Sequence, residues 1–371
     1  MKLLALNVGS STIKYAVFEG QKELYRGLVD YVELGGKKHP RVLANALDAV
    51  LTKILKCGVA SSLHEINAVV HRIVHGGMQK KSVIINKRIL DEVRAFALLA
   101  PLHDIPEIKV VELCQKRFEC PQIAVFDTAF HQSMPEQAWR YALPIEWMDA
   151  YSVRRFGFHG LSHKYMAMRV PLIVKRKIKR LIACHIGNGV SVTAIKNGVS
   201  VDTSMGWTPL EGCVMGTRCG DIDPSIPVLL MGSHGFSKKE MAEALNTRSG
   251  LFALCGELDM RRIVKRKDAK ARMAVDVFCY RIQKYIGAYA AALGGVDAIA
   301  FTGGIGQHCD EVRRRILKDL GFLGITLDRE KNKINWQIIS RPSSKVKVLV
   351  VPCDEERMMM LEALQILPKN V

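Results

Sequence analysis

The sequence lacks the cysteine patterns that mark a disulfide framework or a zinc site. Its 371 residues include ten cysteines, but no two of them are spaced as Cys-x-x-Cys. Cysteines placed singly in a long chain are typical of reduced thiols. The first apolar stretch, residues 3–6, is too short for the hydrophobic region of a signal peptide. We therefore expect a cytoplasmic protein.

Long uninterrupted hydrophobic runs are also missing. The longest weakly charged stretch covers residues 285–304 and is broken by Gly294, Gly295 and Asp297. A membrane-spanning helix needs roughly 20 consecutive apolar residues. A buried helix followed by a buried strand explains this stretch better, so we expect no membrane partner.

Acidic residues are scarce relative to basic ones, with 36 Asp and Glu against 54 Lys and Arg and a net charge of +18. The basic clusters at 175–180, 261–267 and 313–315 are separated and are not interleaved with aromatic residues that could stack on bases. We expect solvated helix faces and no nucleic-acid partner. The charge still predicts a general attraction for anions, including phosphorylated metabolites.

Linkers rich in Pro, Gly or Ser are absent, although the chain is long enough for two domains. Helical patterns such as 39–57 and 269–293 alternate with strand-like runs. These runs cover residues 2–7, 15–19, 68–74, 122–126, 180–185, 190–195, 297–301 and 346–351. The mixture predicts an α/β architecture whose domains pack around a cleft.

One internal similarity stands out among the features that are present. The segments "LALNVGSSTIKYAVFEG" (4–20) and "IACHIGNGVSVTAIKNG" (182–198) both read as a strand, a small-residue turn and a second strand. They predict two domains of similar topology. A third glycine turn, "FTGGIGQ" (301–307), again follows an apolar strand. A single turn of this kind could equally be an ordinary hairpin turn. Three of them, each after a strand, favour loops that converge on a polyphosphate.

Longer motifs carry a resemblance to a known family. The chain resembles the acetate kinases, of the acetate and sugar kinase, Hsp70 and actin superfamily. The matching blocks include "NVGSSTIK", "HRIVHGG", "AVFDTAFHQSMP", "RRFGFHGLSHKY", "CHIGNGVSVTAIKNG", "DTSMGWTPLEGCVMGTRCGDIDPSI" and "PCDEERMM". The resemblance implies two ribonuclease-H-like, actin-like ATPase domains with an active-site cleft between them. Their expected ranges are 1–128 with 357–371, and 129–356. It also implies a homodimer joined through the C-terminal domains.

The reaction implied by the resemblance is reversible phosphoryl transfer from ATP to acetate. A carboxylate is already ionised at neutral pH, so its attack needs no general base. The difficulty is charge, because an anion must approach an anionic γ-phosphate. Arginines suit that task because a guanidinium binds carboxylate or phosphate oxygens bidentately. In their motifs Arg72 and Arg218 are the expected catalytic arginines, although each alone reads as a structural ion pair.

Histidines and carboxylates complete the expected catalytic set. His159 is the expected hydrogen-bond donor to the transferred phosphoryl group, with His103 supporting and His185 at the second phosphate loop. A zinc pair formed by His159 and His163 is disfavoured by the intervening glycine. Mg²⁺ (or Mn²⁺) prefers oxygen ligands. The resemblance gives Asn7 and Glu355 for the metal, and Asp127 for orienting the metal and Arg218; residues alone do not separate Glu355 from Glu356.

The resemblance also places the two substrates. The expected nucleotide-binding residues are Ser10, Thr12, Lys14, His185, Gly187, Asn188, Gly189, Gly303, Gly304 and Ile305. Small Gly304 beside Ile305 favours an open adenosine pocket, and hence ATP over pyrophosphate. Arg72 and an apolar pocket of Val74, Leu102, Phe158 and Pro209 are expected to bind the acyl substrate. A valine at position 74 favours acetate over propionate by about 1–3 kcal/mol.

Two motifs depart from the family pattern. The family's "GIGEN" is "GIGQH" (304–308), and its "LHNPAN" is "LHDIPE" (102–107). Two alternatives to an acetate kinase follow: a kinase for propionate or another short-chain acid, and an actin-like nucleotide-binding module without transfer activity.

Overall fold

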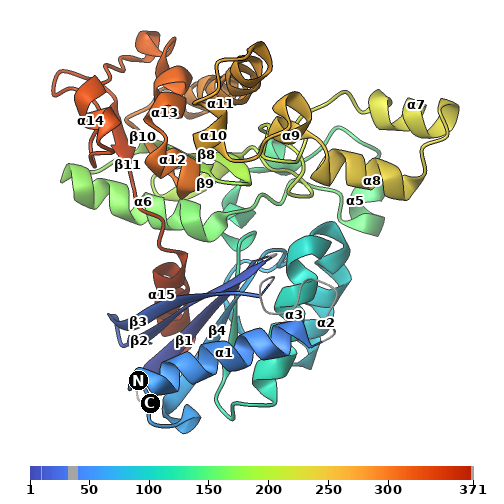
Figure 1. The fold of residues 1–371 in the computed structure, drawn as a ribbon, viewed down its shortest axis with the longest axis vertical. Helices are drawn as coiled ribbons and strands as arrows, with labels where there is room; N and C mark the ends of the chain where they lie inside the picture. The colour runs from blue at the N-terminus through green and yellow to red at the C-terminus, as the bar shows by residue number, and fades with distance from the viewer. Residues whose placement is uncertain (10, 32–40, 369–371) are drawn as a thin grey trace. The chain divides into compact units, whose positions relative to one another are not determined.

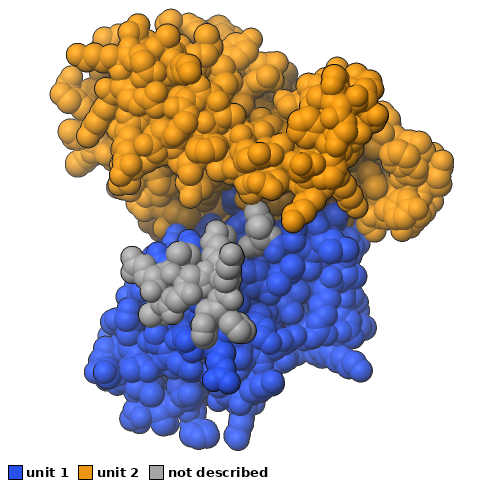
Figure 2. Space-filling model, turned by 45° about the vertical axis from the view of Figure 1, so that its right-hand side comes forward, with its two compact units in different colours: residues 1–132, 159–161, 354–371 blue, residues 133–158, 162–353 orange. Residues whose placement is uncertain are grey.

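The computed structural model describes residues 1–9, 11–31 and 41–368, and these form two compact units. Unit 1 comprises residues 1–132, 159–161 and 354–371, and unit 2 comprises residues 133–158 and 162–353 (Figure 2). The domain ranges expected from the sequence stay a prediction.

Unit 1 is built on a mixed sheet with the strand order β3-β2-β1-β4-β6-β5. Its strands are β1 (Lys2–Val8), β2 (Thr12–Glu19), β3 (Lys22–Asp30), β4 (Ile66–Ile73), β5 (Val83–Ile84) and β6 (Gln122–Phe126). Its helices are α1 (Val42–Lys56), α2 (Lys87–Phe96), α3 (Pro101–Gln115) and α15 (Glu355–Ile366). Short 3-10 helices cover Leu63–Glu65, Ala97–Leu99 and Ala129–Ser133, the last ending in unit 2.

Both faces of this sheet are covered, which explains why β1 reads as a continuous apolar run. Leu4, Leu6 and Val8 pack in one core cluster with residues of α1 and α3. Side chains alternate between the two faces of a strand, so Asn7 points to the opposite face. There α15 packs against β1, β2, β4 and β6 (Figure 1).

Unit 2 contains a second mixed sheet with the order β11-β10-β7-β8-β9. Its strands are β7 (Arg180–Ile186), β8 (Val190–Lys196), β9 (Val199–Thr203), β10 (Ala298–Thr302) and β11 (Lys347–Val350). Its helices are α4 (Glu136–Trp139), α5 (Ile145–Tyr151), α7 (Ser225–Ser233), α8 (Lys238–Thr247), α9 (Gly250–Cys255), α10 (Met260–Ile263), α11 (Ala269–Leu293), α12 (Gly303–His308), α13 (Asp310–Leu317) and α14 (Arg329–Lys333). Helix α6 (Gly160–Val174) begins in unit 1 and continues in unit 2, and a 3-10 helix covers Gly321–Leu323.

The two sheets repeat one topology. In each, the first strand pairs antiparallel with the second and parallel with the fourth, as β1 does with β2 and β4, and β7 with β8 and β10. Each sheet then adds one more parallel strand, β6 beside β4 and β11 beside β10. In unit 1 the short strand β5 pairs antiparallel with β6 beyond it. The α/β prediction and the two similar topologies expected from the internal similarity are confirmed.

The predicted strands and both long helices are present. Strand 122–126 and helix 269–293 have the expected bounds, and the other predicted elements have shifted ends. Strand β2 begins at Thr12, three residues before the expected start, so Thr12 belongs to the strand and not to the turn. Part of the expected helix 39–57 lies outside the described residues, and α1 covers Val42–Lys56. All ten cysteines are free thiols. Among the described helices, none is both long and apolar enough to cross a membrane.

Candidate active site

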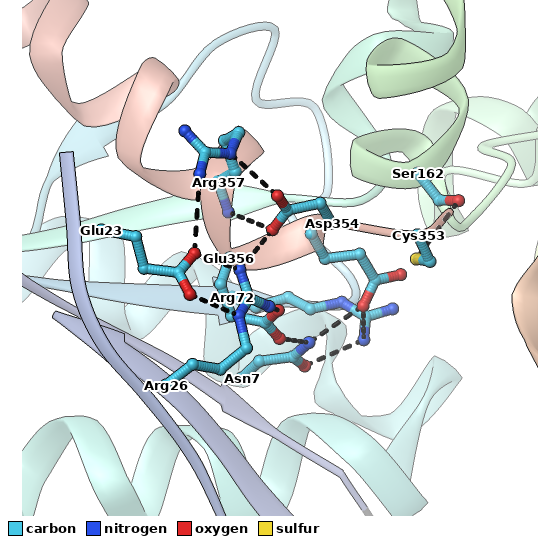
Figure 3. A network of polar contacts seen from close by, with 10 residues as sticks. Asn7, Glu23, Arg26, Arg72, Ser162, Cys353, Asp354, Glu356 and Arg357 are labelled. Atoms are coloured by element: carbon cyan, nitrogen blue, oxygen red, sulfur yellow. Dashed lines mark hydrogen bonds and ion pairs between the residues drawn. The ribbon is translucent and has the colours of Figure 1, made fainter. Parts of the chain in front are cut away.

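The polar residues of unit 1 gather where its parallel strands end. Asn7 and Arg72 are the second-last residues of β1 and β4, and Asp127 directly follows β6. The carboxyl ends of parallel strands lie at one edge of a sheet. Helix α15 begins at the same edge, and its first residues are Glu355 and Glu356. Figure 3 shows Asn7 and Arg72 directed toward this first turn of α15.

Arg72 is the centre of this cluster. Its Nε and Nη2 atoms donate to the two carboxylate oxygens of Asp127 at 3.1 and 2.6 Å, a bidentate pair. Its Nη1 donates to Asn7 Oδ1 at 3.0 Å and, less closely, to Glu355 Oε2 at 3.3 Å. Burial acts to lower the pKa of Arg72, but the charges of Asp127 and Glu355 outweigh it and raise that pKa well above its ordinary value. The guanidinium is therefore fixed in direction and permanently charged.

Asp127 is fully buried and serves two neighbours. Burial raises the pKa of its carboxyl group, and the charge of Arg72 offsets that effect only in part. One of its oxygens also accepts the backbone N–H of His159 at 3.3 Å. The resemblance implied a role for Asp127 toward the metal and Arg218; within unit 1 its direct side-chain partner is Arg72.

Glu355 and Glu356, which the sequence alone did not distinguish, have different partners in the structure. The amide nitrogen of Asn7 donates to both, at 2.9 Å to Glu355 Oε2 and at 2.9 Å to Glu356 Oε1. Both side chains are buried. Only Glu356 is paired with Arg26, whose Nη1 lies 2.6 Å from Glu356 Oε2 (Figure 3). Glu356 is therefore neutralised on the β3 side, whereas Glu355 faces Arg72.

Sequence reasoning missed Arg26, which holds the first turn of α15 in place. Besides Glu356, its Nη2 contacts Asp354 Oδ1 at 2.6 Å and Glu23 Oε2 at 2.8 Å. Asp354 caps α15 by accepting the N–H of Arg357 at 3.2 Å. Arg26 lies in β3, which no sequence pattern predicted, and its partners Asp354 and Glu356 are more than 300 residues away. No signal in the sequence could have found these contacts.

His159 adopts an unusual backbone conformation beside Asp127. Its φ of 57° lies in the left-handed region, which is costly for a residue with a side chain. The next residue, Gly160, is required because a Cβ there would lie 1.9 Å from the carbonyl oxygen of Asp127. The "FHG" motif thus brings the backbone of His159 onto Asp127. His163 has a structural role, since its Nε2 is 2.6 Å from Ser191 Oγ in the core of unit 2.

The other predicted residues of unit 1 lie along the same strands. Lys14 stands opposite Asn7 in the β1–β2 ladder, and Thr12 accepts the Gly9 N–H through its carbonyl oxygen at 2.8 Å. Val74 follows β4 and is buried. His103 lies in the first turn of α3. Ser10, and the side chain of Leu102, lie outside the described residues.

In unit 2 the two predicted nucleotide loops lie side by side. His185 and Thr302 are paired at the ends of β7 and β10, directly before the two glycine turns. Gly303 has a φ of 79°, and a Cβ on it would come within 2.6 Å of the Ile186 carbonyl oxygen. Only glycine allows this approach. His185 is oriented by Ser162, whose Oγ lies 2.8 Å from Nδ1.

The turn from Gly187 to Gly189 is tight and is joined to the Arg218 loop. Gly187 N–H donates to the carbonyl of Gly189 at 2.9 Å, and Gly216 N–H donates to the carbonyl of Asn188 at 3.2 Å. Gly304 and Ile305 follow in the first turn of α12. These predicted residues form one cluster at the carboxyl ends of β7 and β10.

Arg218 itself is anchored on the Pro209 segment. Its Nη1 donates to the carbonyl oxygen of Pro209 at 3.3 Å, and burial lowers the pKa of its guanidinium. The Arg218 loop is held by the start of α9, where Leu251 N–H donates to the carbonyl of Met215 at 2.9 Å. The predicted Phe158 is buried in unit 2 as well.

Sequence reasoning also missed one anchor of unit 2, Arg155. Arg155 donates to the carbonyl oxygens of Thr203, Ser204 and Met205 at 3.0 to 3.2 Å and forms an ion pair with Glu211. It therefore fixes the segment that leads to Pro209. Arg155 stands in the quoted motif "RRFGFHGLSHKY", so its position was visible, but its role depends on carbonyls that only the fold brings together.

Comparison with known proteins gives a consistent result. The family model described as "Acetokinase family" matches residues 2–361. Acetate kinase of Carboxydothermus hydrogenoformans is 46% identical over 394 residues, covering 99% of each chain. Two solved structures align with a TM-score of 0.88: a propionate kinase from Francisella tularensis (37% identical, 97% of this chain and 98% of that one) and the acetate kinase of Porphyromonas gingivalis (39% identical, 99% and 100%). The resemblance inferred from the motifs is confirmed.

Proposed function

The chain belongs to the acetokinase family, and from that premise we propose that it transfers the γ-phosphoryl group of ATP to acetate, reversibly, giving acetyl phosphate and ADP. The observation that carries the proposal is the state of Arg72. A buried guanidinium that is aimed by Asp127 and Asn7, and that cannot lose its charge, is suited to hold an anionic acyl group.

Arg72 would meet the carboxylate through Nη1. Its Nε and Nη2 are committed to Asp127, whereas Nη1 has its longest contact, 3.3 Å, with Glu355. An incoming carboxylate can replace that contact without disturbing the bidentate pair. Asp127 thereby positions Arg72. Val74, buried next to β4, would limit the room for the acyl chain, with Leu102, Phe158 and Pro209 as the other proposed pocket residues.

Arg218 would act on the transferred phosphoryl group. In the phosphoryl-transfer transition state, negative charge spreads over the equatorial oxygens. A partly desolvated guanidinium, fixed by the Pro209 carbonyl, stabilises such charge more strongly than it would in water. We assign His159 as a further donor to the same oxygens, with His103 in support. The nucleotide would be held by Ser10, Thr12 and Lys14 and by the loops at 185–189 and 303–305.

The donor set of unit 1 fits a divalent cation. Glu355 offers a buried carboxylate and Asn7 an amide oxygen, which are ligands that Mg²⁺ or Mn²⁺ accepts. We propose that these two residues hold the metal, and not Glu356, whose charge is already balanced by Arg26. When bound, the metal would neutralise charge on the nucleotide phosphates.

We also propose a homodimer that forms through unit 2. Helix α7 exposes a series of apolar side chains, with Ile226, Val228 and Leu229 each about half exposed or more (46%, 64% and 59%). Apolar surface gathered on one helix marks an interaction site. Sedimentation of the purified protein tests this proposal, and a monomer at micromolar concentration would contradict it.

The activity is tested by trapping the acyl phosphate with hydroxylamine. Purified protein receives MgATP with acetate, propionate or butyrate at equal concentration, and MgPPi serves as the control donor. We expect hydroxamate to form fastest with acetate and ATP. Faster formation with propionate would assign the chain to the alternative acid. If ATP binds but no acid gives product, the chain is a nucleotide-binding module without transfer activity.

A further inference from the structure

Two acidic residues of α3 are buried one helical turn apart. Asp104 and Glu107 have exposed fractions of 0% and 1%. Each uses one carboxyl oxygen to accept a backbone N–H from the segment after β4. Asp104 Oδ1 is 3.0 Å from the nitrogen of His75, and Glu107 Oε2 is 2.9 Å from the nitrogen of Val74. The pair therefore holds two consecutive peptide groups.

The other two oxygens of the pair lack an external donor. Asp104 Oδ2 and Glu107 Oε1 are buried and receive no N–H or O–H from any other residue in the described part of the chain. The side chain of Glu107 lies close enough to Asp104 to affect its pKa. Two ionised carboxylates are acceptors only, so a hydrogen bond between them requires a proton on one of them. A shared proton would satisfy both buried oxygens at once.

The surroundings favour keeping that proton. Burial raises the pKa of Asp104 to about 7 and raises that of Glu107 well above its ordinary value. The charge of Asp104 further opposes ionisation of Glu107. The charged groups that face the pair are Arg72 on β4, which favours ionisation, and Asp127 after β6, which disfavours it. Tyr31, after β3, faces Glu107 as a neutral phenol whose pKa burial raises to about 12.

We propose that Asp104 and Glu107 share one proton, and that this neutral contact positions the Val74–His75 segment and thereby the acyl pocket. This inference rests on the proposed function, which assigns Val74 to the pocket. When the proton is lost, two adjacent buried carboxylates repel each other. Their hydrogen bonds to the N–H groups of Val74 and His75 then weaken. Acetate binding then weakens while the phosphoryl-transfer residues stay in place.

The proton is tested first on the apoprotein, without any substrate. We expect an infrared carbonyl band of a protonated carboxyl group at neutral pH that disappears in the double variant D104N/E107N. Glu112→Gln is the matched control, because this residue lies on the same helix but is paired with Arg94 at the surface. It should leave the band unchanged. A spectrum without the band, or a band that survives unchanged in D104N/E107N, would overturn the shared proton whatever the enzyme's activity.

The effect on the pocket is tested by the pH dependence of acetate KM. In the unaltered protein KM should rise about 5-fold as the pair loses its proton on the alkaline side, while kcat changes little, which is the effect of weakening about one hydrogen bond. In D104N/E107N neither side chain of the pair can ionise, and each amide oxygen can still accept its backbone N–H, so KM should stay flat over the same range. Equal profiles in both proteins would refute the positioning role. Absence of any turnover in the unaltered protein would refute the proposed function and leave the infrared result standing.

Discussion

Replacing Arg72 by alanine should destabilise unit 1 strongly, apart from any loss of activity. The change removes the bidentate partner of Asp127 and one contact of Glu355, and both carboxylates are buried. Breaking a buried ion pair by removing one partner costs about 3–5 kcal/mol, because an uncompensated charge remains inside the protein. We therefore expect the free energy required to open β4 and β6 to decrease by about that amount.

The loss should depend on pH. Burial already raises the pKa of Asp127 above its unfolded value, and without Arg72 the opposing effect is gone. A carboxyl group whose pKa is raised by folding is favourable at low pH and becomes unfavourable as pH rises through its folded-state value. The difference between variant and unaltered protein should therefore be small near pH 4 and grow toward neutral pH.

Hydrogen exchange of peptides from β4 and β6 is the suitable assay. All four tryptophans lie in unit 2, so intrinsic fluorescence would report on the wrong unit. The double variant R72A/D127N removes both partners and should recover part of the loss. Arg94→Ala is the control, because its ion pairs with Asp91 and Glu112 are exposed and should be worth only about 0–1 kcal/mol. The reasoning would be refuted if R72A lowered the free energy of opening by less than about 1 kcal/mol, if this loss did not depend on pH, and if D127N did not reduce it.

Three further substitutions test the proposed roles. Arg218→Ala should lower kcat about 10²–10³-fold and leave MgATP binding nearly unchanged, because its charge acts in the transition state; near-normal turnover would remove Arg218 from the site. Val74→Ala should raise kcat/KM for propionate relative to acetate by about tenfold, within the 1–3 kcal/mol that one methylene is worth; an unchanged ratio would mean that the acyl pocket lies elsewhere. Glu355→Gln should raise the Mg²⁺ concentration needed for half-maximal rate more than Glu356→Gln does, because Arg26 already neutralises Glu356; the reverse order would identify Glu356 as the metal ligand.

Local patterns in the sequence were enough for the architecture. Apolar runs of strand length and amphipathic helical patterns specify elements through contacts between near neighbours, and the repeated strand-turn-strand design of 4–20 and 182–198 reappears as two sheets of one topology. Strand β3 was not predicted because its sequence, KELYRGLVD, mixes charged residues with few apolar ones. It is a strand because the hairpin with β2 supplies its hydrogen bonds.

The family, and with it the residues to examine, also followed from the sequence, since long motifs are specific. What the sequence could not give is which atoms meet. Arg72 contacts Asp127 and Glu355 across 55 and 283 residues, and Arg26 contacts Glu356 across 330. Partners so distant are set by the order in which the strands assemble. The different partners of Glu355 and Glu356, and the backbone N–H groups of Val74 and His75 that Glu107 and Asp104 accept, therefore emerged only from the tertiary structure.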